Sequence, residues 1–265
     1  MGDPDIALGG RAQAGEEPGA LVVVLYNILY WPYLLSTCAV LFPPALLIFL
    51  GTVLWDRNLR ILHRYTTWWG AHYLTRAPLV TVVVEGREGL DPNRSYVYVA
   101  NHQSMVDILA VFSTGLDFKW VSKVENFFVP FIGWNMILNR YISLRRGHKP
   151  SIVRMYRTCD AWIAAGLSVF MFPEGTRSPD GDIKEFFGGA FKIATKNNVP
   201  IVPILIEGTG KILPKSSFRI APYPVTIRIL EPIEPSSVGG DADKLHEVVR
   251  SRMIEEQGRM RGRAR

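Results

Sequence analysis

Two adjoining stretches of the chain decide its fold: SYVYVA at Ser95–Ala100 and, directly after it, NHQSMVD at Asn101–Asp107. The first is a short run rich in valine and tyrosine, which is typical of a buried β-strand. The second leads into Met105–Ser113, where apolar residues recur at helical spacing. Open α/β sheets place their sites where a strand ends and the next helix begins. These residues therefore predict an α/β fold with a candidate site at this turn.

The chain from Pro78 onward repeats this alternation of short β-branched runs and helical stretches. Two further helices are predicted at Ser151–Ala165 and Ala190–Asn197. The other predicted strands are Leu79–Val84, Lys119–Ser122, Tyr141–Leu144, Leu167–Phe172, Ile201–Glu207 and Val225–Ile229. Such alternation predicts a mixed, largely buried central sheet that is flanked by helices.

An uncharged, apolar segment precedes this α/β region. From Ala20 to Trp55 the chain contains no Asp, Glu, Lys, Arg or His. A single membrane span needs roughly 20 apolar residues, and Pro43-Pro44 divides the segment into a longer and a shorter piece. Two arrangements fit this pattern: one transmembrane helix with an interfacial extension, or a re-entrant hairpin that does not cross the bilayer.

The charges on either side of the apolar segment predict its orientation. The first nineteen residues are acidic on balance, whereas Arg57, Arg60, Arg64 and Arg76 follow the segment. Because positively charged flanks stay on the cytoplasmic side, the rest of the chain is expected in the cytoplasm. A cleaved signal peptide is not expected, since its basic start is missing.

Residues Trp55–Leu74 have the spacing of an amphipathic helix. Its arginines share one side, and the opposite side carries large apolar residues. These apolar residues are Trp55, Leu59, Leu62, Trp69 and Tyr73. An aromatic-rich face opposite arginines suits a helix in the lipid headgroup layer, and the adjoining apolar segment favours this interpretation. The alternative is an ordinary helix whose apolar face packs on the protein core.

The composition limits the classes of protein that fit. Of the 265 residues, 48% are hydrophobic and 20% are charged, which excludes both a disordered chain and a polytopic membrane protein. The net charge of +6 favours an anionic partner, for which a phospholipid surface and a nucleic acid both qualify. The two cysteines, Cys38 and Cys159, make no disulfide framework and indicate a reducing compartment.

His102 and Asp107 can form a catalytic pair in only one geometry. Residues five positions apart on a regular helix point about 140° from each other. His102 must therefore precede the first helical turn, with its ring folded back over that turn. The carboxylate then fixes the imidazole tautomer and stabilises the cation that forms when His102 takes a hydroxyl proton. Alternatively, Ser104-x-x-Asp107 is a capping box, and Asp107 only starts the helix.

A second candidate cluster, FPEGTRS at Phe172–Ser178, also follows a predicted strand. Proline and glycine around Glu174 make a tight turn whose backbone can approach a ligand closely. Glu174 can accept a hydrogen bond from a glycerol hydroxyl, and Arg177 offers two parallel donors to a phosphate. The alternative is a surface turn with a local ion pair. The sequence has no Gly-x-Ser-x-Gly elbow and no metal-ligand spacing among its histidines, so neither a serine hydrolase nor a metal site is expected.

Four blocks of the sequence resemble the glycerolipid acyltransferase family, especially the 1-acylglycerol-3-phosphate O-acyltransferases. That family carries an Asn-His-x4-Asp block, a Gly-Trp segment leading to an arginine, a Phe-Pro-Glu-Gly-Thr-Arg block and a Val-Pro-Ile-Val-Pro block. The matching residues are, in the same order, Asn101–Asp107, Gly133-Trp134 leading to Arg145-Arg146, Phe172–Arg177 and Val199–Pro203. Four blocks in the right order make coincidence very improbable.

The resemblance implies roles for individual residues. It implies that His102 is the general base and that Asp107 is its partner. It implies that Val199–Pro203 lines the acyl site or supports the sheet beneath it. Arg145 stands where the family often has an acid, which leaves the details of anion binding open. Substrate binding is implied for six residues: Lys123, Arg146, Glu174, Gly175, Thr176 and Arg177.

The activity that the resemblance implies is transfer of a fatty acyl group from acyl-CoA or acyl carrier protein. The acceptor is the sn-2 hydroxyl of 1-acylglycerol-3-phosphate, and the product is phosphatidic acid for phospholipid biosynthesis. No resident cofactor or metal is expected, because a thioester is already activated. The expected partners are these substrates and a phospholipid surface, with acyl carrier protein as one candidate donor and no nucleic acid. The alternatives are another acceptor (a lyso-ornithine lipid, another lysophospholipid or glycerol-3-phosphate) or a membrane lipid-binding protein without catalysis.

Four regions are therefore expected along the chain. They are a disordered tail at residues 1–19, membrane-anchoring helices at 20–75, an acyltransferase domain at 76–240, and a C-terminal helix with a basic tail at 241–265. The first region is rich in Gly, Glu, Pro and Ala, which is typical of disorder.

Overall fold

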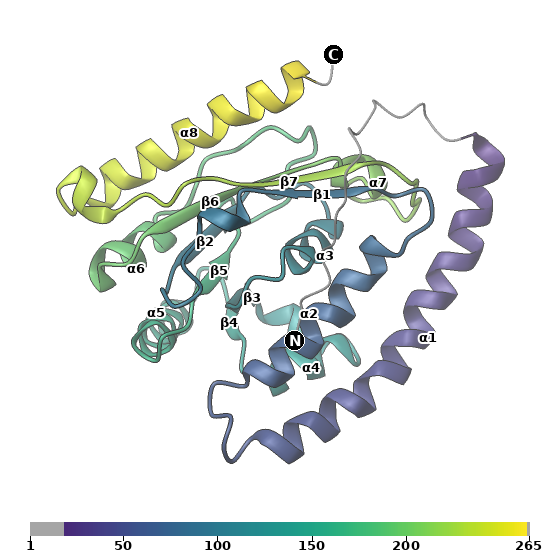
Figure 1. The fold of residues 1–265 in the computed structure, drawn as a ribbon, viewed down its shortest axis with the longest axis horizontal. Coiled ribbons are helices and arrows are strands. Elements are labelled where there is room, and N and C mark those ends of the chain that lie inside the picture. The colour runs from purple at the N-terminus through teal and green to yellow at the C-terminus, as the bar shows by residue number, and fades with distance from the viewer. Residues whose placement is uncertain (1–18, 264–265) are drawn as a thin grey trace.

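A seven-stranded sheet forms the centre of the computed structural model, which describes residues 19–263 (Figure 1). Neighbouring strands run parallel except β6 and β7, which pair antiparallel, so the sheet is mixed as predicted. All seven predicted strands are present. In sheet order they are β1 (Val82–Glu85), β7 (Val225–Ile229), β6 (Ile201–Glu207), β2 (Val97–Ala100), β5 (Val169–Met171), β3 (Lys119–Lys123) and β4 (Ile142–Leu144).

Helices cover both faces of this sheet. Tyr98 and Ala100 of β2 pack with α3 on one face, whereas Val97 and Val99 pack with α5, α6 and α8 on the other. This division follows from the two-residue period of a strand. Both faces of the central strands are thus buried, which explains their nearly continuous apolar sequences. The covering helices are α2 (Arg60–Thr75), α3 (Val106–Ser113), α5 (Lys149–Ala164), α6 (Gly189–Asn197) and α8 (Ala242–Arg263).

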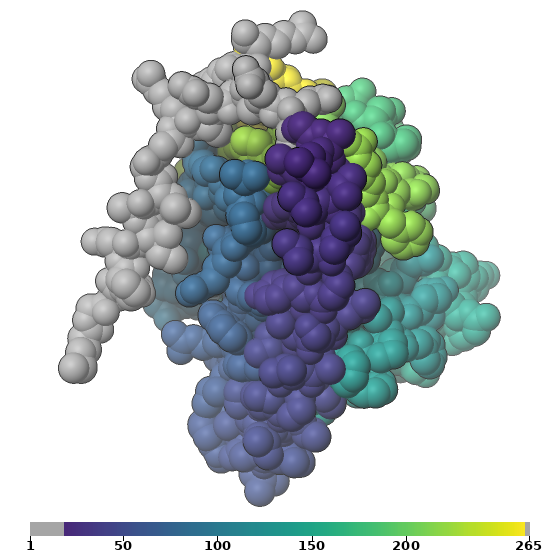
Figure 2. Space-filling view, turned by 90° about the vertical axis from the view of Figure 1, so that its right-hand side faces the viewer, coloured from purple at the N-terminus to yellow at the C-terminus, as the bar shows by residue number. Residues whose placement is uncertain are grey.

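The apolar N-terminal segment forms one helix, α1 (Ala20–Thr52), which passes along one side of the molecule beside α2 (Figures 1 and 2). Pro43 and Pro44 lie inside this helix, so the expected division at these residues is wrong. A proline removes one backbone hydrogen bond and bends a helix without necessarily ending it. Few side chains of α1 are buried, and its length and composition are sufficient to cross a membrane.

The amphipathic helix α2 begins at Arg60 rather than at Trp55, because the chain turns at residues 53–59 between α1 and α2. Leu59 precedes it with a φ of 56°, and Asp56 accepts a hydrogen bond from the backbone N–H of Ile61. Leu59, Leu62, Trp69 and Tyr73 are buried in a cluster with residues of α1. Trp55, the fifth residue of the predicted face, precedes α2 and is 67% exposed. For the other four residues the expected position in the headgroup layer is wrong, and the core-packing alternative holds.

The C-terminal end of the chain differs from the expected basic tail. Helix α8 continues to Arg263, so Arg259 and Arg261 belong to a helix. Arg259 pairs with Glu255 at 2.5 Å, and Arg261 pairs with Asp182. The tail predicted at residues 1–19 lies outside the described residues except for Gly19. The remaining short elements are η1 (Arg87–Gly89), η2 (Val124–Phe128), α4 (Ile132–Leu138), α7 (Thr209–Ile212) and η3 (Pro235–Val238).

Candidate active site

The candidate residues meet at one edge of the sheet. Strands β2, β5, β3 and β4 run parallel, so their carboxyl ends share this edge. His102 follows β2, and Glu174 to Arg177 follow β5. Lys123 ends β3, and Arg146 lies two residues beyond β4. This is the position at which α/β sheets place their sites.

The side chains of His102 and Asp107 are in contact. The ring nitrogen Nδ1 of His102 lies 2.8 Å from Oδ2 of Asp107. Helix α3 begins at Val106, so His102 precedes the first turn as the predicted geometry requires. Because an ionised carboxylate only accepts hydrogen bonds, Nδ1 carries the ring proton and Nε2 carries the lone pair.

The same Asp107 carboxylate also starts helix α3. Its Oδ2 accepts the backbone N–H of Gln103 at 2.6 Å and that of Ser104 at 2.8 Å. Its Oδ1 accepts the hydroxyl of Thr209, the first residue of α7, at 2.5 Å. Asp107 is fully buried, and four donors surround it. The two interpretations of Asp107, as capping residue and as partner of His102, therefore both describe the structure.

The imidazole of His102 is held between this carboxylate and an aromatic ring. It stacks on Phe172, the residue after β5, with ring centroids 4.1 Å apart and an interplanar angle of 13°. The side chain keeps 15% of its surface exposed, whereas Asp107 has none. Nε2 makes no hydrogen bond to any residue from 19 to 263. A basic nitrogen thus remains available at the surface of the site.

Glu174 holds the backbone of His102 in place. Its Oε1 accepts the His102 N–H at 2.9 Å, and its Oε2 accepts the Lys184 N–H at 3.4 Å. Burial raises the pKa of Glu174 from its usual 4.5 to about 7, although these two backbone donors oppose the shift. Since both oxygens are engaged within the chain, the geometry favours a positioning role. Contact between Glu174 and an acyl acceptor stays a prediction.

The turn after Glu174 brings two predicted phosphate contacts to the dyad. Gly175 has a φ of +68°, and a Cβ there would lie 2.6 Å from the ring of Phe187 and 3.6 Å from the guanidinium carbon of Arg146. Arg177 is half-buried, and the next residue, Ser178, donates its N–H to the carbonyl oxygen of His102 at 2.7 Å. Arg146 and Arg177 therefore both flank the site.

Two other residues predicted to bind substrate make no polar contact with the dyad. Thr176 is exposed, and so is Lys123 at the end of β3. Neither forms a side-chain hydrogen bond or ion pair with the dyad in the part of the chain that the structure describes. Their roles in substrate binding stay predictions. Within residues 19–263, no group of three or more His, Cys, Asp or Glu side chains is arranged to hold a metal ion.

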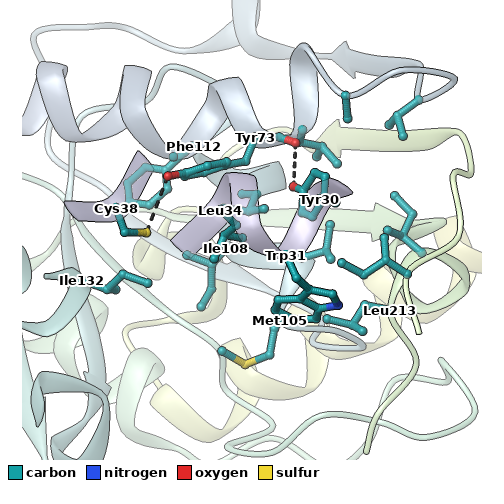
Figure 3. A pocket seen from close by; sticks show the side chains of 18 of the residues that line it. Tyr30, Trp31, Leu34, Cys38, Tyr73, Met105, Ile108, Phe112, Ile132 and Leu213 are labelled. Carbon is teal, nitrogen blue, oxygen red and sulfur yellow. Dashed lines mark hydrogen bonds between the residues drawn. The ribbon is translucent and has the colours of Figure 1, made fainter. Parts of the chain in front are cut away.

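An apolar cavity of about 440 Å³ adjoins the site (Figure 3). Trp31, Leu34 and Cys38 of α1 form one wall, and α2, α3, α4 and residues 212–220 contribute the others. Met105 and Arg177 line it as well, which links the cavity to the turns that carry the dyad. None of the residues 199–203 lines it, so the Val-Pro-Ile-Val-Pro block supports the sheet.

Three features of the site could not be predicted from the sequence. Thr209 reaches Asp107 across 102 positions of the chain, and no motif connects them. Trp31 lies in a segment whose apolar composition pointed to lipid rather than to a cavity wall. Phe172 was quoted within its motif, but its stacking on His102 depends on the adjacency of β2 and β5.

Known proteins are similar to this chain in sequence and in fold. A model of the acyltransferase family matches residues 81–207. A 1-acyl-sn-glycerol-3-phosphate acyltransferase of Chlamydomonas reinhardtii is 33% identical, over 91% of this chain and 72% of the relative. The chloroplastic enzyme of the same name from Arabidopsis thaliana is 41% identical, over 67% of this chain but only 49% of its own length. The crystal structure of the 1-acyl-sn-glycerophosphate acyltransferase PlsC from Thermotoga maritima superposes with a TM-score of 0.69 at 29% identity, covering 90% of this chain and 95% of that one.

The mixed α/β fold and these similarities define an O-acyltransferase of lipid metabolism. The chain belongs to the acyltransferase family that includes the 1-acyl-sn-glycerol-3-phosphate acyltransferases.

Proposed function

We propose that this acyltransferase transfers a fatty acyl group to the sn-2 hydroxyl of 1-acylglycerol-3-phosphate and releases phosphatidic acid. The observation that carries the proposal is the free Nε2 of His102, oriented by Asp107 and flanked by Arg146 and Arg177. A base, an anion-binding pair and an apolar cavity lie together at one sheet edge. The relatives from Chlamydomonas, Arabidopsis and Thermotoga bear the name of this activity.

In the proposed reaction, Nε2 of His102 takes the proton of the acceptor hydroxyl while its oxygen attacks the thioester carbonyl. The carbon–sulfur bond breaks, and the thiolate recovers a proton from the imidazolium. Asp107 stabilises the transient cation, because its buried carboxylate lies 2.8 Å from Nδ1. The donor is acyl-CoA or acyl carrier protein. The thioester is already activated, so the proposed reaction uses no resident cofactor.

Arg177 and Arg146 are proposed to bind the acceptor's phosphate. A guanidinium presents parallel donors that match phosphate oxygens. Beside the dyad, Arg146 is exposed and Arg177 is half-buried. The cavity is proposed to hold a hydrocarbon chain, since its lining is almost entirely apolar and Arg177 marks its end near the site. One ligand would thus have its charge at the arginines and its chain among α1, α2 and α3.

We also propose that α1 anchors the protein to a membrane with the sheet on the cytoplasmic side. Most large apolar side chains of α1 face outward. The arginines that follow it, among them Arg57, Arg60 and Arg64, favour the cytoplasmic side.

The test is a transfer assay with radiolabelled acyl-CoA and the purified full-length chain in mixed micelles. Phosphatidic acid is expected from 1-acylglycerol-3-phosphate, with weaker or no products from glycerol-3-phosphate and a lyso-ornithine lipid. Transfer to one of the other acceptors in preference to 1-acylglycerol-3-phosphate would contradict the proposed acceptor. Binding of lysolipid without transfer from either acyl-CoA or acyl carrier protein would contradict the proposed reaction.

A further inference from the structure

Helix α4 (Ile132–Leu138) is oriented with its polar side inward. Asn135 and the following Asn139 are 5% and 0% exposed, whereas Trp134 and Ile137 are 44% and 56% exposed. A surface helix in water has the opposite arrangement, with apolar residues on the core and polar residues outside. An apolar neighbour is therefore expected on the outer side of α4.

A buried hydrogen-bond network fixes this orientation. The amide nitrogens of Asn135 and Asn139 donate to the Thr66 hydroxyl of α2 at 3.0 and 2.9 Å. The Asn139 amide also donates to the Asn135 backbone carbonyl at 2.9 Å. Rotating α4 to hide its apolar side would break these bonds and leave buried polar groups without partners. The outward apolar side is thus built into the packing of α4 on α2.

The segment before α4 extends the same apolar surface. Phe128 of η2 is 77% exposed, and Val129 and Ile132 are exposed beside it. The surface continues onto α1, because Phe42 of α1 contacts Trp134 with ring centroids 5.5 Å apart. Figure 2 shows residues of this part of the chain, in teal, alongside α1 in purple on one face of the molecule. Single exposed apolar residues are common, but a continuous surface of this kind marks an interaction site.

The charges that border the segment indicate an anionic surface. Lys123 precedes η2, and Arg140 follows α4; both are exposed. Arg145 and Arg146 come soon after, and Glu125 is the single acid between residues 123 and 146. An apolar surface bordered by lysine and arginine matches the acyl chains and phosphates of a lipid layer.

We propose that residues 124–138, the η2–α4 segment, form a second membrane-contact element that inserts its apolar side into an anionic phospholipid bilayer. This inference rests on the membrane location in the proposed function, which assigned the contact to α1 alone. Ile132 and Asn135 also line the apolar cavity. The segment therefore connects the lipid layer with the cavity wall and gives a lysolipid a short path from the bilayer to the dyad.

Lipid-borne quenching tests the insertion directly. The full chain carries Phe128→Cys or Ile137→Cys, and an environment-sensitive fluorophore is attached to the new cysteine. The labelled protein is reconstituted in phosphatidylcholine–phosphatidylglycerol vesicles whose acyl chains carry a nitroxide quencher. The native Cys38 and Cys159 are buried and stay unlabelled in the folded protein. The reference is Leu47→Cys on the outer side of α1, and the control is Ile254→Cys on α8, 42% exposed on the other side of the sheet.

We expect the labels at 128 and 137 to be quenched as strongly as the label at 47, and the label at 254 to be quenched little. Quenching at 128 and 137 no stronger than at 254 would overturn the inference. The label at 47 separates two failures: if it is quenched while 128 and 137 are not, α1 is a membrane anchor without help from η2 and α4. If it is not quenched either, the proposed membrane location fails as well.

A kinetic measurement gives a second, independent readout. Phe128→Ser/Ile137→Ser is expected to raise KM for acceptor presented in vesicles by about tenfold, since two apolar side chains leave the lipid. The rate with a short-chain acceptor dissolved in water is expected to stay unchanged, because neither residue contacts the dyad. Val248→Ser/Ile254→Ser on α8 is the matched control. An unchanged KM in vesicles would contradict the proposed insertion.

Discussion

Asp107 couples the shape of the turn to the state of the imidazole. One carboxylate oxygen accepts the backbone N–H groups of Gln103 and Ser104 and also faces Nδ1 of His102. The start of α3 and the tautomer of His102 therefore depend on the same atom. A sequence pattern cannot separate these two functions, because both use a residue of the same kind at the same position.

The substitution Asp107→Asn is expected to lower kcat by about 10²- to 10⁴-fold, because an amide lacks the negative charge that stabilises the imidazolium. Loss of the charged cap is also expected to lower the thermal midpoint. Both are measured on micellar protein, by labelled-acyl transfer and by circular dichroism. Asp117→Asn, a substitution at a carboxylate 44% exposed and outside the site, is the control. Equal rates for the two variants would contradict the account of Asp107.

Thr209 is expected to be a positioning residue that acts through Asp107. Thr209→Val keeps the side-chain volume but removes the hydroxyl that donates to Oδ1 at 2.5 Å. We expect kcat to fall by about tenfold, as for the loss of one hydrogen bond to a charged group, with little change in KM. Thr209→Ser should restore most of the rate. Failure of serine to do better than valine would show that the hydroxyl is not the relevant group.

Glu174 gives the protein a pH-dependent stability with a defined sign. Burial raises its pKa from 4.5 in the unfolded chain to about 7 in the folded one. Between these values the folded state binds more protons, so the contribution of Glu174 to stability is present below pH 4.5 and is lost as the pH rises through about 7.

The substitution Glu174→Gln removes this titration. The thermal midpoint of the wild type, measured relative to that of the variant, is therefore expected to fall between pH 4.5 and pH 7 and to level off above. Differential scanning fluorimetry in micelles over this range measures the difference. A difference that rises with pH, or stays constant, would contradict a raised pKa at Glu174.

At the scale of elements, the contact between α2 and α3 is the closest helix packing near the site. A Cβ on Gly70 of α2 would lie 2.2 Å from a ring carbon of Phe112 on α3. Gly70→Ala is thus expected to destabilise the fold by about 1–3 kcal/mol through overpacking. Gly51→Ala in α1, where a Cβ meets nothing within 4 Å, is the matched control and is expected to be neutral or slightly stabilising. Equal midpoints in thermal unfolding would contradict the close contact.

Most elements of the fold could be predicted from local patterns. The seven strands were predicted from their short β-branched runs, of which β2, β5 and most of β6 are buried on both faces, and β6 and β7 have the predicted bounds. The apolar face of α2 was interpreted wrongly. Amphipathic spacing shows that one side of a helix is covered, but it does not show whether protein or lipid covers it. The division predicted at Pro43-Pro44 was wrong for a related reason. A helix that packs against α2 and α4 tolerates prolines that would end an isolated helix.

At the scale of the whole molecule, the site depends on contacts that no local pattern contains. The approach of His102 to Asp107 was predictable, because it needs only one turn of chain. The bond from Thr209 to Asp107 and the cavity between α1 and α3 were not, because both depend on how the chain returns to the sheet edge. The outward apolar side of α4 was also not predictable, since both buried asparagines donate to Thr66 of α2, which is far from them in the sequence.

The central claim is that Nε2 of His102 takes the proton of the acceptor hydroxyl. Its most direct test is the rate of acyl transfer to 1-acylglycerol-3-phosphate by His102→Ala, with His148→Ala, a substitution at an exposed histidine outside the site, as control. The account predicts a rate about 10²- to 10⁴-fold below wild type for His102→Ala, at an unchanged thermal midpoint, and a near-normal rate for the control. A folded His102→Ala protein that transfers acyl groups at the wild-type rate would contradict it.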